Sequence, residues 1–89
     1  MSDQISWHVD AWEDYLYWQK NDKKIFRKIN ELIREIIRDP FSGIGKPEPL
    51  RHALRGYWSR RINKEHRLIY QATDKAIHII QCRYHYMVG

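Results

Sequence analysis

Four residues near the C-terminus, Arg83-Tyr84-His85-Tyr86, combine a cation, two aromatic rings and a histidine. Histidine titrates near physiological pH, guanidinium groups suit phosphate, and tyrosine rings can stack on nucleobases. Chain ends are normally frayed and tolerant of change, so such a cluster is unexpected there. These side chains are equipped to act on RNA, and we interpret them as half of an active site.

Two further residues stand apart from the hydrophobic pattern. Glu48 lies between two prolines in Gly45-Lys46-Pro47-Glu48-Pro49-Leu50, and Arg67 lies in Glu65-His66-Arg67-Leu68. Each has an ordinary explanation when taken singly, because loop glutamates are usually solvated and strand arginines are usually edge charges. A histidine near a terminus usually has no role either. The combination of Glu48, Arg67 and His85 is more specific than its parts.

The composition predicts one small basic domain. The chain has 89 residues, and its 16 Lys and Arg against 11 Asp and Glu give a formal charge of +5. This length favours a single core spanning residues 1–89, with function at the surface rather than in a large cofactor cavity. The charge favours a polyanion or an acidic protein as partner, although charge alone is weak support.

The sequence also predicts where the protein works. The single cysteine, Cys82, cannot form an internal disulfide, which fits a reducing cytosol. Residues 1–6 lack the pattern of a signal peptide, and no run of about 18 apolar residues is present to span a membrane. We therefore expect a cytoplasmic protein without membrane contact.

Hydrophobic periodicity predicts two helices in the first half of the chain. After a short strand at 4–7, apolar residues recur at helical spacing up to Asn21-Asp22. Asp22 can cap a second helix, whose isoleucines and leucine share one face and which ends at Asp39-Pro40. The stretch from 41 to 50 is rich in glycine and proline, so we expect a structured loop there.

Three short β-rich runs follow, at 57–62, 66–72 and 76–82, and they predict an antiparallel meander. Two helices followed by a meander indicate an α+β fold in which the helices cover one face of the sheet. Alternation places Arg67, Ile69 and Gln71 on one face of the middle strand. It places His66, Leu68 and Tyr70 on the opposite face. The sequence does not decide which face is inward, and we expect function on the uncovered one.

Other chemistry is poorly supported, and no cofactor or metal is expected. His78 and Cys82 are four residues apart in a predicted strand, which separates them by about 13 Å, too far to share one metal ion. Cys82 is better explained as a small core side chain. No histidine is locally arranged to activate Ser59 as a nucleophile.

Several segments, in this order and without large gaps, resemble the YoeB-like toxins of the RelE superfamily. They are Trp12-Glu13-Asp14-Tyr15-Leu16-Tyr17-Trp18, Lys28-Ile29-Asn30-Glu31-Leu32-Ile33, Gly45-Lys46-Pro47-Glu48-Pro49-Leu50, Trp58-Ser59-Arg60-Arg61-Ile62, Glu65-His66-Arg67-Leu68 and Cys82-Arg83-Tyr84-His85-Tyr86. The resemblance implies the RelE-like fold, with two N-terminal helices on a twisted antiparallel β-sheet, often dimeric. It implies a toxin that pairs with a YefM-like antitoxin and cleaves mRNA in the ribosomal A site. It further implies contact with operator DNA only through the antitoxin complex.

The resemblance also implies a division of roles among the site residues. The family's catalytic glutamate, arginine and histidine fall on Glu48, Arg67 and His85. The family's neighbouring RNA-binding positions correspond, less securely, to Lys46, Arg51, Arg61 and Tyr86, which match or replace the family's residues there. RNA can be cut without metal if a base takes the 2′-hydroxyl proton, a cation stabilises the charge on the phosphoryl group, and an acid protonates the leaving oxygen. The three catalytic candidates can fill these roles in that order.

The chain departs from the family pattern at its C-terminus, where Met87-Val88-Gly89 follow the usual His-Tyr ending. Two alternative functions stay open. One is a basic module that binds RNA or the ribosome and blocks translation without cutting. The other is a small protein-interaction domain whose charge only keeps it soluble, and the coincidence of three candidate catalytic residues argues against it.

Overall fold

The computed structural model describes residues 2–85 of the chain. It begins with a short strand, β1 (Gln4–Trp7), which leads directly into helix α1 (Val9–Asn21). The ring of His8 caps α1, since its Nδ1 accepts the Asp10 N–H at 3.1 Å. Asp22 then separates the two helices and caps α2 (Lys23–Arg38), because its carboxylate accepts the Ile25 N–H at 3.2 Å. Both helices and the Asp22 cap are confirmed.

The second half of the chain supplies the rest of the sheet. It contains β2 (Glu48–Pro49), a 3₁₀ helix (His52–Leu54), β3 (Trp58–Arg61), β4 (Arg67–Ala72) and β5 (Ala76–Gln81). The five strands are ordered β1-β5-β4-β3-β2. The predicted meander of β3, β4 and β5 is antiparallel, as expected. The two prolines flanking Glu48 are compatible with β2 because it is an edge strand.

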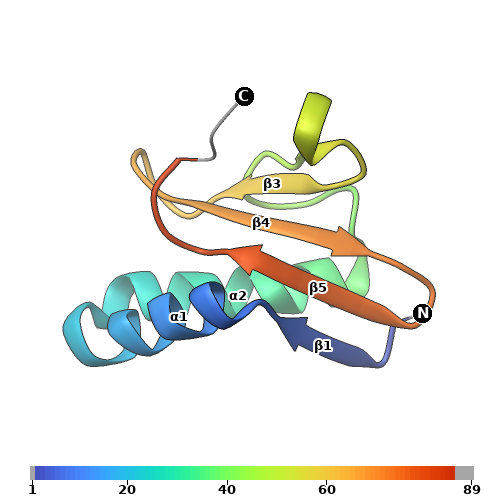
Figure 1. Ribbon diagram of the computed structural model, residues 1–89. Helices are drawn as coiled ribbons and strands as arrows, with labels where there is room; N and C mark the ends of the chain where they lie inside the picture. The colour runs from blue at the N-terminus through green and yellow to red at the C-terminus, as the bar shows by residue number, and fades with distance from the viewer. Residues whose placement is uncertain (1, 86–89) are drawn as a thin grey trace.

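One feature of the predicted sheet needs correction, because β1 runs parallel to β5 and the sheet is therefore mixed. The direction of β1 follows from its connection. His8 donates its backbone N–H to Ile79 O at 2.8 Å, so the start of α1 is fastened to β5 and β1 must run alongside that strand. The α+β architecture of two helices on a sheet is otherwise confirmed (Figure 1).

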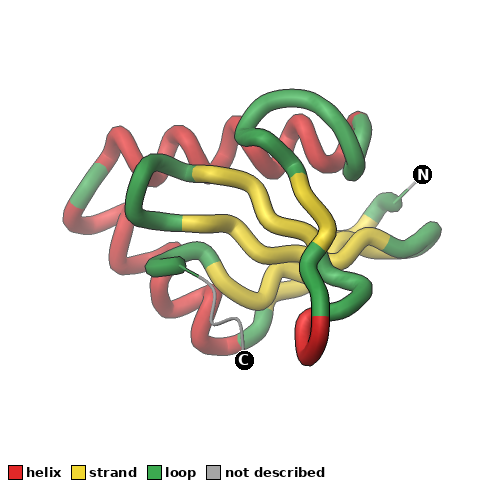
Figure 2. Tube along the Cα trace, turned by 90° about the horizontal axis from the view of Figure 1, so that it is seen from above, coloured by secondary structure: helices red, strands yellow, loops and turns green. Residues whose placement is uncertain are grey.

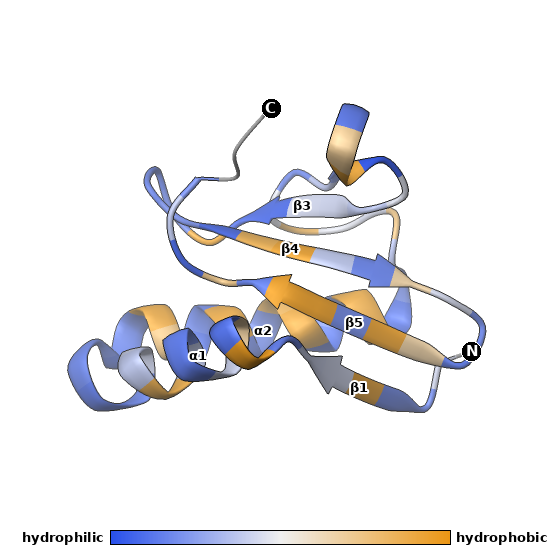
Figure 3. Ribbon diagram, viewed as in Figure 1, coloured by the Kyte–Doolittle hydropathy of each residue, from blue (hydrophilic) through white to orange (hydrophobic). Residues whose placement is uncertain are grey.

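The hydrophobic core lies between the helices and the face of the sheet that carries Leu68, Tyr70, Ile77 and Ile79. From α2, Ile29, Leu32, Ile33 and Ile36 pack into it. Figure 3 shows the strongest hydrophobic colour on β5, whereas β3 is pale or blue. The core positions of Leu68 and Tyr70 show which face of β4 is inward, and Arg67, Ile69 and Gln71 belong to the opposite face.

The 3₁₀ helix lies on the opposite side of the sheet from the long helices (Figure 1). Figure 2 shows the strands between α2 on one side of the view and the 3₁₀ helix on the other. After β5 the chain turns back past the connection between β3 and β4 (Figure 1). The segment that carries Arg83, Tyr84 and His85 therefore lies beside the start of β4.

Candidate active site

The register of four strands places Glu48 in a row that crosses the sheet. Glu48 opposes Ser59, Ser59 opposes Ile69, and Ile69 opposes Gln81. Directly opposed residues of antiparallel strands project from the same face, so this row lies on the face away from the hydrophobic core. Glu48 is exposed at the β2 edge of this face, and Gln81 stands at the other end.

Arg67 occupies the next position on the same face. It opposes Arg61 across β3 and β4, and it is 7% exposed. Its Nη1 donates to the backbone oxygens of Asn63, Lys64 and His66 at 2.7, 3.3 and 3.1 Å. These contacts fix one corner of the guanidinium group against the turn between the strands, and none of them uses Nε or Nη2.

The segment after β5 is fastened to the sheet, as an acid held in line with a leaving group would require. The Arg67 N–H donates to Tyr84 O at 3.0 Å, and the Tyr84 N–H donates to His66 Nδ1 at 2.7 Å. The amide nitrogen of Gln81 lies 3.0, 3.3 and 3.1 Å from the backbone oxygens of Arg83, Tyr84 and His85. The backbone around His85 is thus attached to β4 and β5.

His66 and Gln81 were not predicted as site residues. His66 is buried, at 6% exposure. The alternation that groups His66 with the core residues of β4 is the signal that could have identified it. Nothing in the pattern of β5 singles out Gln81, because its contacts depend on how the following segment folds back.

Two cations, Lys46 and Arg61, lie near each other, one in the segment that leads to β2 and the other at the end of β3. Lys46 is exposed with φ 51°, and Gly45 before it has φ 84°. A Cβ on Gly45 would lie 2.8 Å from Leu32 Cδ2, so both conformation and space require glycine there. Gly45 O accepts the Arg61 N–H at 2.6 Å, which brings Lys46 close to Arg61.

The loop before β2 is held by Arg60, a residue that faces the core and is fully buried. Its Nη1 donates to Ile44 O at 3.0 Å, and its Nη2 donates to Asp39 O and Ser42 O at 2.7 and 2.8 Å. Its Nε donates to the Tyr70 hydroxyl at 3.0 Å. Arg60 therefore has a structural role, whereas its neighbour Arg61 is exposed on the face that carries Glu48.

Arg83 points back to α1 rather than to the sheet face. Its Cζ lies 4.0 Å from the ring centroid of Tyr17 and 4.8 Å from that of Tyr84. Its Nη1 is 3.6 Å from Asp14 Oδ1. The guanidinium group that first suggested a phosphate contact at this end is thus occupied in fastening the segment to α1.

The remaining candidates divide into exposed and undescribed residues. Arg51 is exposed next to the 3₁₀ helix, and His85 is exposed at the end of the anchored segment. Tyr86 and the tail Met87-Val88-Gly89 lie outside the described residues. The structure thus brings Glu48, Arg61 and Arg67 onto one face and attaches the segment of His85 to β4 and β5.

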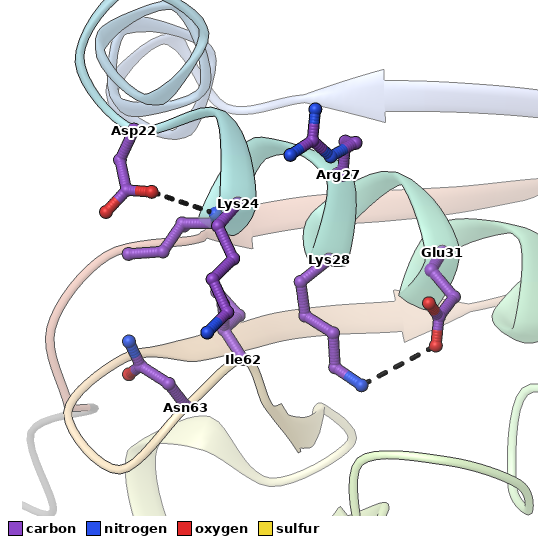
Figure 4. A pocket seen from close by; sticks show the side chains of 8 residues that line it. Asp22, Lys24, Arg27, Lys28, Glu31, Ile62 and Asn63 are labelled. Carbon is purple, nitrogen blue, oxygen red and sulfur yellow. Dashed lines mark hydrogen bonds and ion pairs between the residues drawn. The ribbon is translucent and has the colours of Figure 1, made fainter.

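A basic hollow adjoins the turn that holds Arg67 (Figure 4). Its lining comes from α2, its cap and the end of β3, and consists of Asp22, Lys24, Ile25, Arg27, Lys28, Glu31, Ile62 and Asn63. Lys28 Nζ lies 3.6 Å from Glu31 Oε1, which leaves Lys24 and Arg27 as additional cations of the hollow. The lining also includes the carboxylates of Asp22 and Glu31, so the hollow carries only a small excess of positive charge.

Cys82 is a core residue, as predicted. It is fully buried, its Sγ donates to Ala11 O at 3.3 Å, and its own O accepts the Trp18 indole N–H at 2.9 Å. Burial, with a smaller contribution from the Asp14 charge, raises the pKa of the thiol to about 12. The neutral thiol is therefore the form present at physiological pH, and it is a poor nucleophile.

Two further kinds of feature are absent from residues 2–85. No three His, Cys, Asp or Glu side chains of this part of the chain gather as a group that could hold a metal ion. Neither α1 nor α2 combines the length and the apolar character needed to cross a membrane.

Comparison with known proteins identifies the family. The family model described as "YoeB-like toxin of bacterial type II toxin-antitoxin system" matches residues 7–86. Toxin YoeB of Escherichia coli K12 is 58% identical over 83 residues, covering 93% of this chain and 99% of that protein.

Solved structures agree in fold. The YoeB/ParE toxin from Agrobacterium tumefaciens has a TM-score of 0.91 at 46% identity, covering 94% of this chain and 100% of that one. The YoeB dimer from Staphylococcus aureus has a TM-score of 0.90 at 52% identity, covering 97% and 100%. This chain therefore belongs to the YoeB-like toxins of bacterial type II toxin–antitoxin systems.

Proposed function

We propose that this toxin is a ribosome-dependent endoribonuclease that cleaves mRNA in the ribosomal A site and so inhibits translation. Glu48 acts as the general base, Arg67 stabilises charge on the phosphoryl group, and His85 acts as the general acid. Lys46, Arg51, Arg61 and Tyr86 contribute RNA contacts. The reaction needs no metal or other cofactor.

The order of the site residues across the sheet carries this proposal. Glu48 lies on β2, the two opposed arginines lie on β3 and β4, and His85 follows β5. An in-line displacement at phosphorus needs its base and its acid on opposite sides of the phosphoryl group, with cations between them. The strand order supports this assignment, because Glu48, the two arginines and the segment of His85 follow one another in that sequence.

The proposed reaction conserves atoms and protons. Glu48 removes the 2′-hydroxyl proton, the 2′-oxygen forms a bond to phosphorus, and the bond from phosphorus to the 5′-oxygen breaks. His85 gives its proton to the departing 5′-oxygen. The products are a 2′,3′-cyclic phosphate and a 5′-hydroxyl end. Each proton-transfer group is expected to contribute roughly 10²- to 10⁴-fold to the rate.

The paired arginines support an anionic substrate. Like charges directly opposed across a sheet destabilise it unless an anion lies between them. Arg61 is exposed. The three contacts of Arg67 with the backbone oxygens of Asn63, Lys64 and His66 all use Nη1. A bridging phosphate would accept from both guanidinium groups, which suits the planar donor fork of arginine.

The partners follow from the relatives. YoeB from Staphylococcus aureus forms a heterotetrameric complex with YefM, and the same toxin forms a dimer. We therefore propose a YefM-like antitoxin as inhibitor and a homodimer of this chain in its absence. The ribosome and mRNA are the targets in the cytoplasm, and operator DNA is contacted only through the antitoxin complex. An acidic antitoxin segment would complement the basic face.

Primer extension on a translated message tests the proposal. Wild type, Glu48→Gln and His85→Ala are induced briefly, and the 5′ ends of the message are mapped. We expect new ends within codons for wild type and their loss in both variants. Identical stops in all three proteins would instead support the alternative, a toxin that blocks translation without cutting. In that case Glu48→Gln should bind RNA more tightly, because the change removes a carboxylate that repels phosphate.

A further inference from the structure

His66 links the two halves of the candidate site. It immediately precedes Arg67, and its Nδ1 accepts the Tyr84 N–H at 2.7 Å. The Tyr84 O in turn accepts the Arg67 N–H at 3.0 Å. Both backbone polar groups of Tyr84 are thus bound by two successive residues at the start of β4.

These bonds hold Tyr84 in a conformation that it would rarely adopt alone. Its φ of 65° lies in the left-handed region, which is sparsely populated by residues other than glycine. The next residue is His85, so the direction in which the chain reaches it depends on this conformation. Without an acceptor for the Tyr84 N–H, the hydrogen bond that this N–H donates is lost, while the bonds to Tyr84 O from Arg67 and Gln81 remain.

The ring of His66 is itself fixed. Its centroid lies 4.8 Å from that of Trp18, with the rings inclined at 65°, and 5.9 Å from that of Tyr84. Trp18 is 5% exposed and donates its indole N–H to Cys82 O. The ring therefore stands between α1 and the anchored segment, on the core side of the sheet rather than on the face that carries Glu48 and Arg67.

The hydrogen bond also defines the tautomer. A ring nitrogen that accepts an N–H must carry a lone pair, so the neutral ring has its proton on Nε2. If Nδ1 carried a proton, its N–H would face the Tyr84 N–H, and the hydrogen bond could not form. Only a side chain with an acceptor at the Nδ1 position can replace His66 in this contact.

We propose that His66 is a positioning residue that holds Tyr84, and through it His85, relative to Arg67. The inference rests on the proposed function of His85 as the acid. His66 acts through the Tyr84 backbone and does not touch the substrate. Asparagine can present its Oδ1 near the place of Nδ1, so His66→Asn is the conservative variant, and His66→Leu keeps bulk but lacks an acceptor.

The first test does not depend on RNA cleavage. Long-range ¹H–¹⁵N correlation spectra of the wild-type protein should show His66 with an unprotonated Nδ1 and a protonated Nε2. The Tyr84 amide should exchange with solvent at least tenfold faster in His66→Leu than in wild type, and His66→Asn should restore slow exchange. A proton on Nδ1 of the neutral ring, or equal Tyr84 exchange in all three proteins, would overturn the inference.

The second test reads the effect on catalysis. With ribosome-bound message, His66→Leu should lower kcat at least tenfold while KM stays within about twofold, and His66→Asn should recover most of the loss. An unchanged kcat in His66→Leu, or an asparagine variant as slow as the leucine variant, would refute the positioning role. If the wild type cuts no RNA, the proposed function fails, and with it the catalytic part of this inference. The ring spectrum and Tyr84 exchange would still decide whether His66 anchors the segment.

Discussion

Arg61 on β3 and Arg67 on β4 are directly opposed, and both belong to the face that carries Glu48. In a protein without an anionic partner this pairing would only weaken the sheet, by up to about 1 kcal/mol. Under the proposed function, a substrate phosphate bound between the two guanidinium groups would offset this repulsion.

Removal of Arg61 should therefore weaken RNA binding and change its dependence on salt. Each phosphate contact with single-stranded RNA contributes about 0.7 to the slope of log K against log salt concentration. We expect Arg61→Gln to reduce that slope by about this amount, as measured by fluorescence anisotropy with a non-cleavable RNA. Arg55→Gln serves as the matched control, because Arg55 is exposed outside the strands. Equal slopes for Arg61→Gln and wild type would exclude a phosphate contact at Arg61.

The adjacent residues Arg60 and Arg61 should respond very differently to the same substitution. Arg60→Leu removes four hydrogen bonds and leaves backbone oxygens of the loop before β2 without their donor. We expect a loss of about 3 kcal/mol in the free energy of unfolding, measured by urea denaturation. Arg61→Leu should change it by about 0.5 kcal/mol or less, since Arg61 is exposed. Similar losses in the two variants would contradict the structural role of Arg60.

Alkaline pH should destabilise the protein through Cys82. In the unfolded chain its thiol ionises near its ordinary pKa of 9.0, whereas in the folded protein burial raises the pKa to about 12. Between these values the folded state binds more protons, so the free energy of unfolding falls as pH rises. Burial also raises the pKa of Tyr15 and Tyr70 above 10.0, which acts in the same direction at higher pH.

The Cys82 contribution can be separated by substitution. Urea denaturation between pH 8 and pH 10 should show a shallower decline for Cys82→Ala than for wild type, even though the variant is less stable overall. Parallel curves over this range would show that ionisation of Cys82 does not contribute.

Local patterns in the sequence predict most of the elements. The spacing of Ile25, Ile29 and Ile36 predicts α2, and Asp22 marks its start, because helix periodicity and capping are properties of neighbouring residues. The parallel pairing of β1 was not predicted, since its partner β5 lies some 70 positions away and the direction depends on how α1 is fastened to the sheet.

The site was predictable to a different extent. Glu48, Arg67 and His85 were selected by their chemistry and by family resemblance, and their catalytic roles stay proposals. The inward position of Arg60 could have been inferred from alternation, which groups it with the apolar Trp58 and Ile62, but its partners are oxygens of a distant loop. The contacts of His66 with Tyr84 depend on the fold of the chain after β5, which no local pattern specifies.

The division of labour between Glu48 and His85 can be measured with a message in which sulfur replaces the bridging 5′-oxygen at the mapped cleavage position. A thiol has a pKa of about 8.5, so a thiolate can leave without protonation, whereas an alkoxide cannot leave readily.

Single-turnover cleavage on the ribosome is then compared for wild type, Glu48→Gln and His85→Ala with both messages. We predict that His85→Ala is slow on the oxygen message and recovers to within about tenfold of wild type on the sulfur message, a gain comparable to what one general acid contributes. Glu48→Gln should stay slow on both. Recovery of Glu48→Gln without recovery of His85→Ala would contradict the assigned roles, and absence of cleavage by wild type would contradict the nuclease itself.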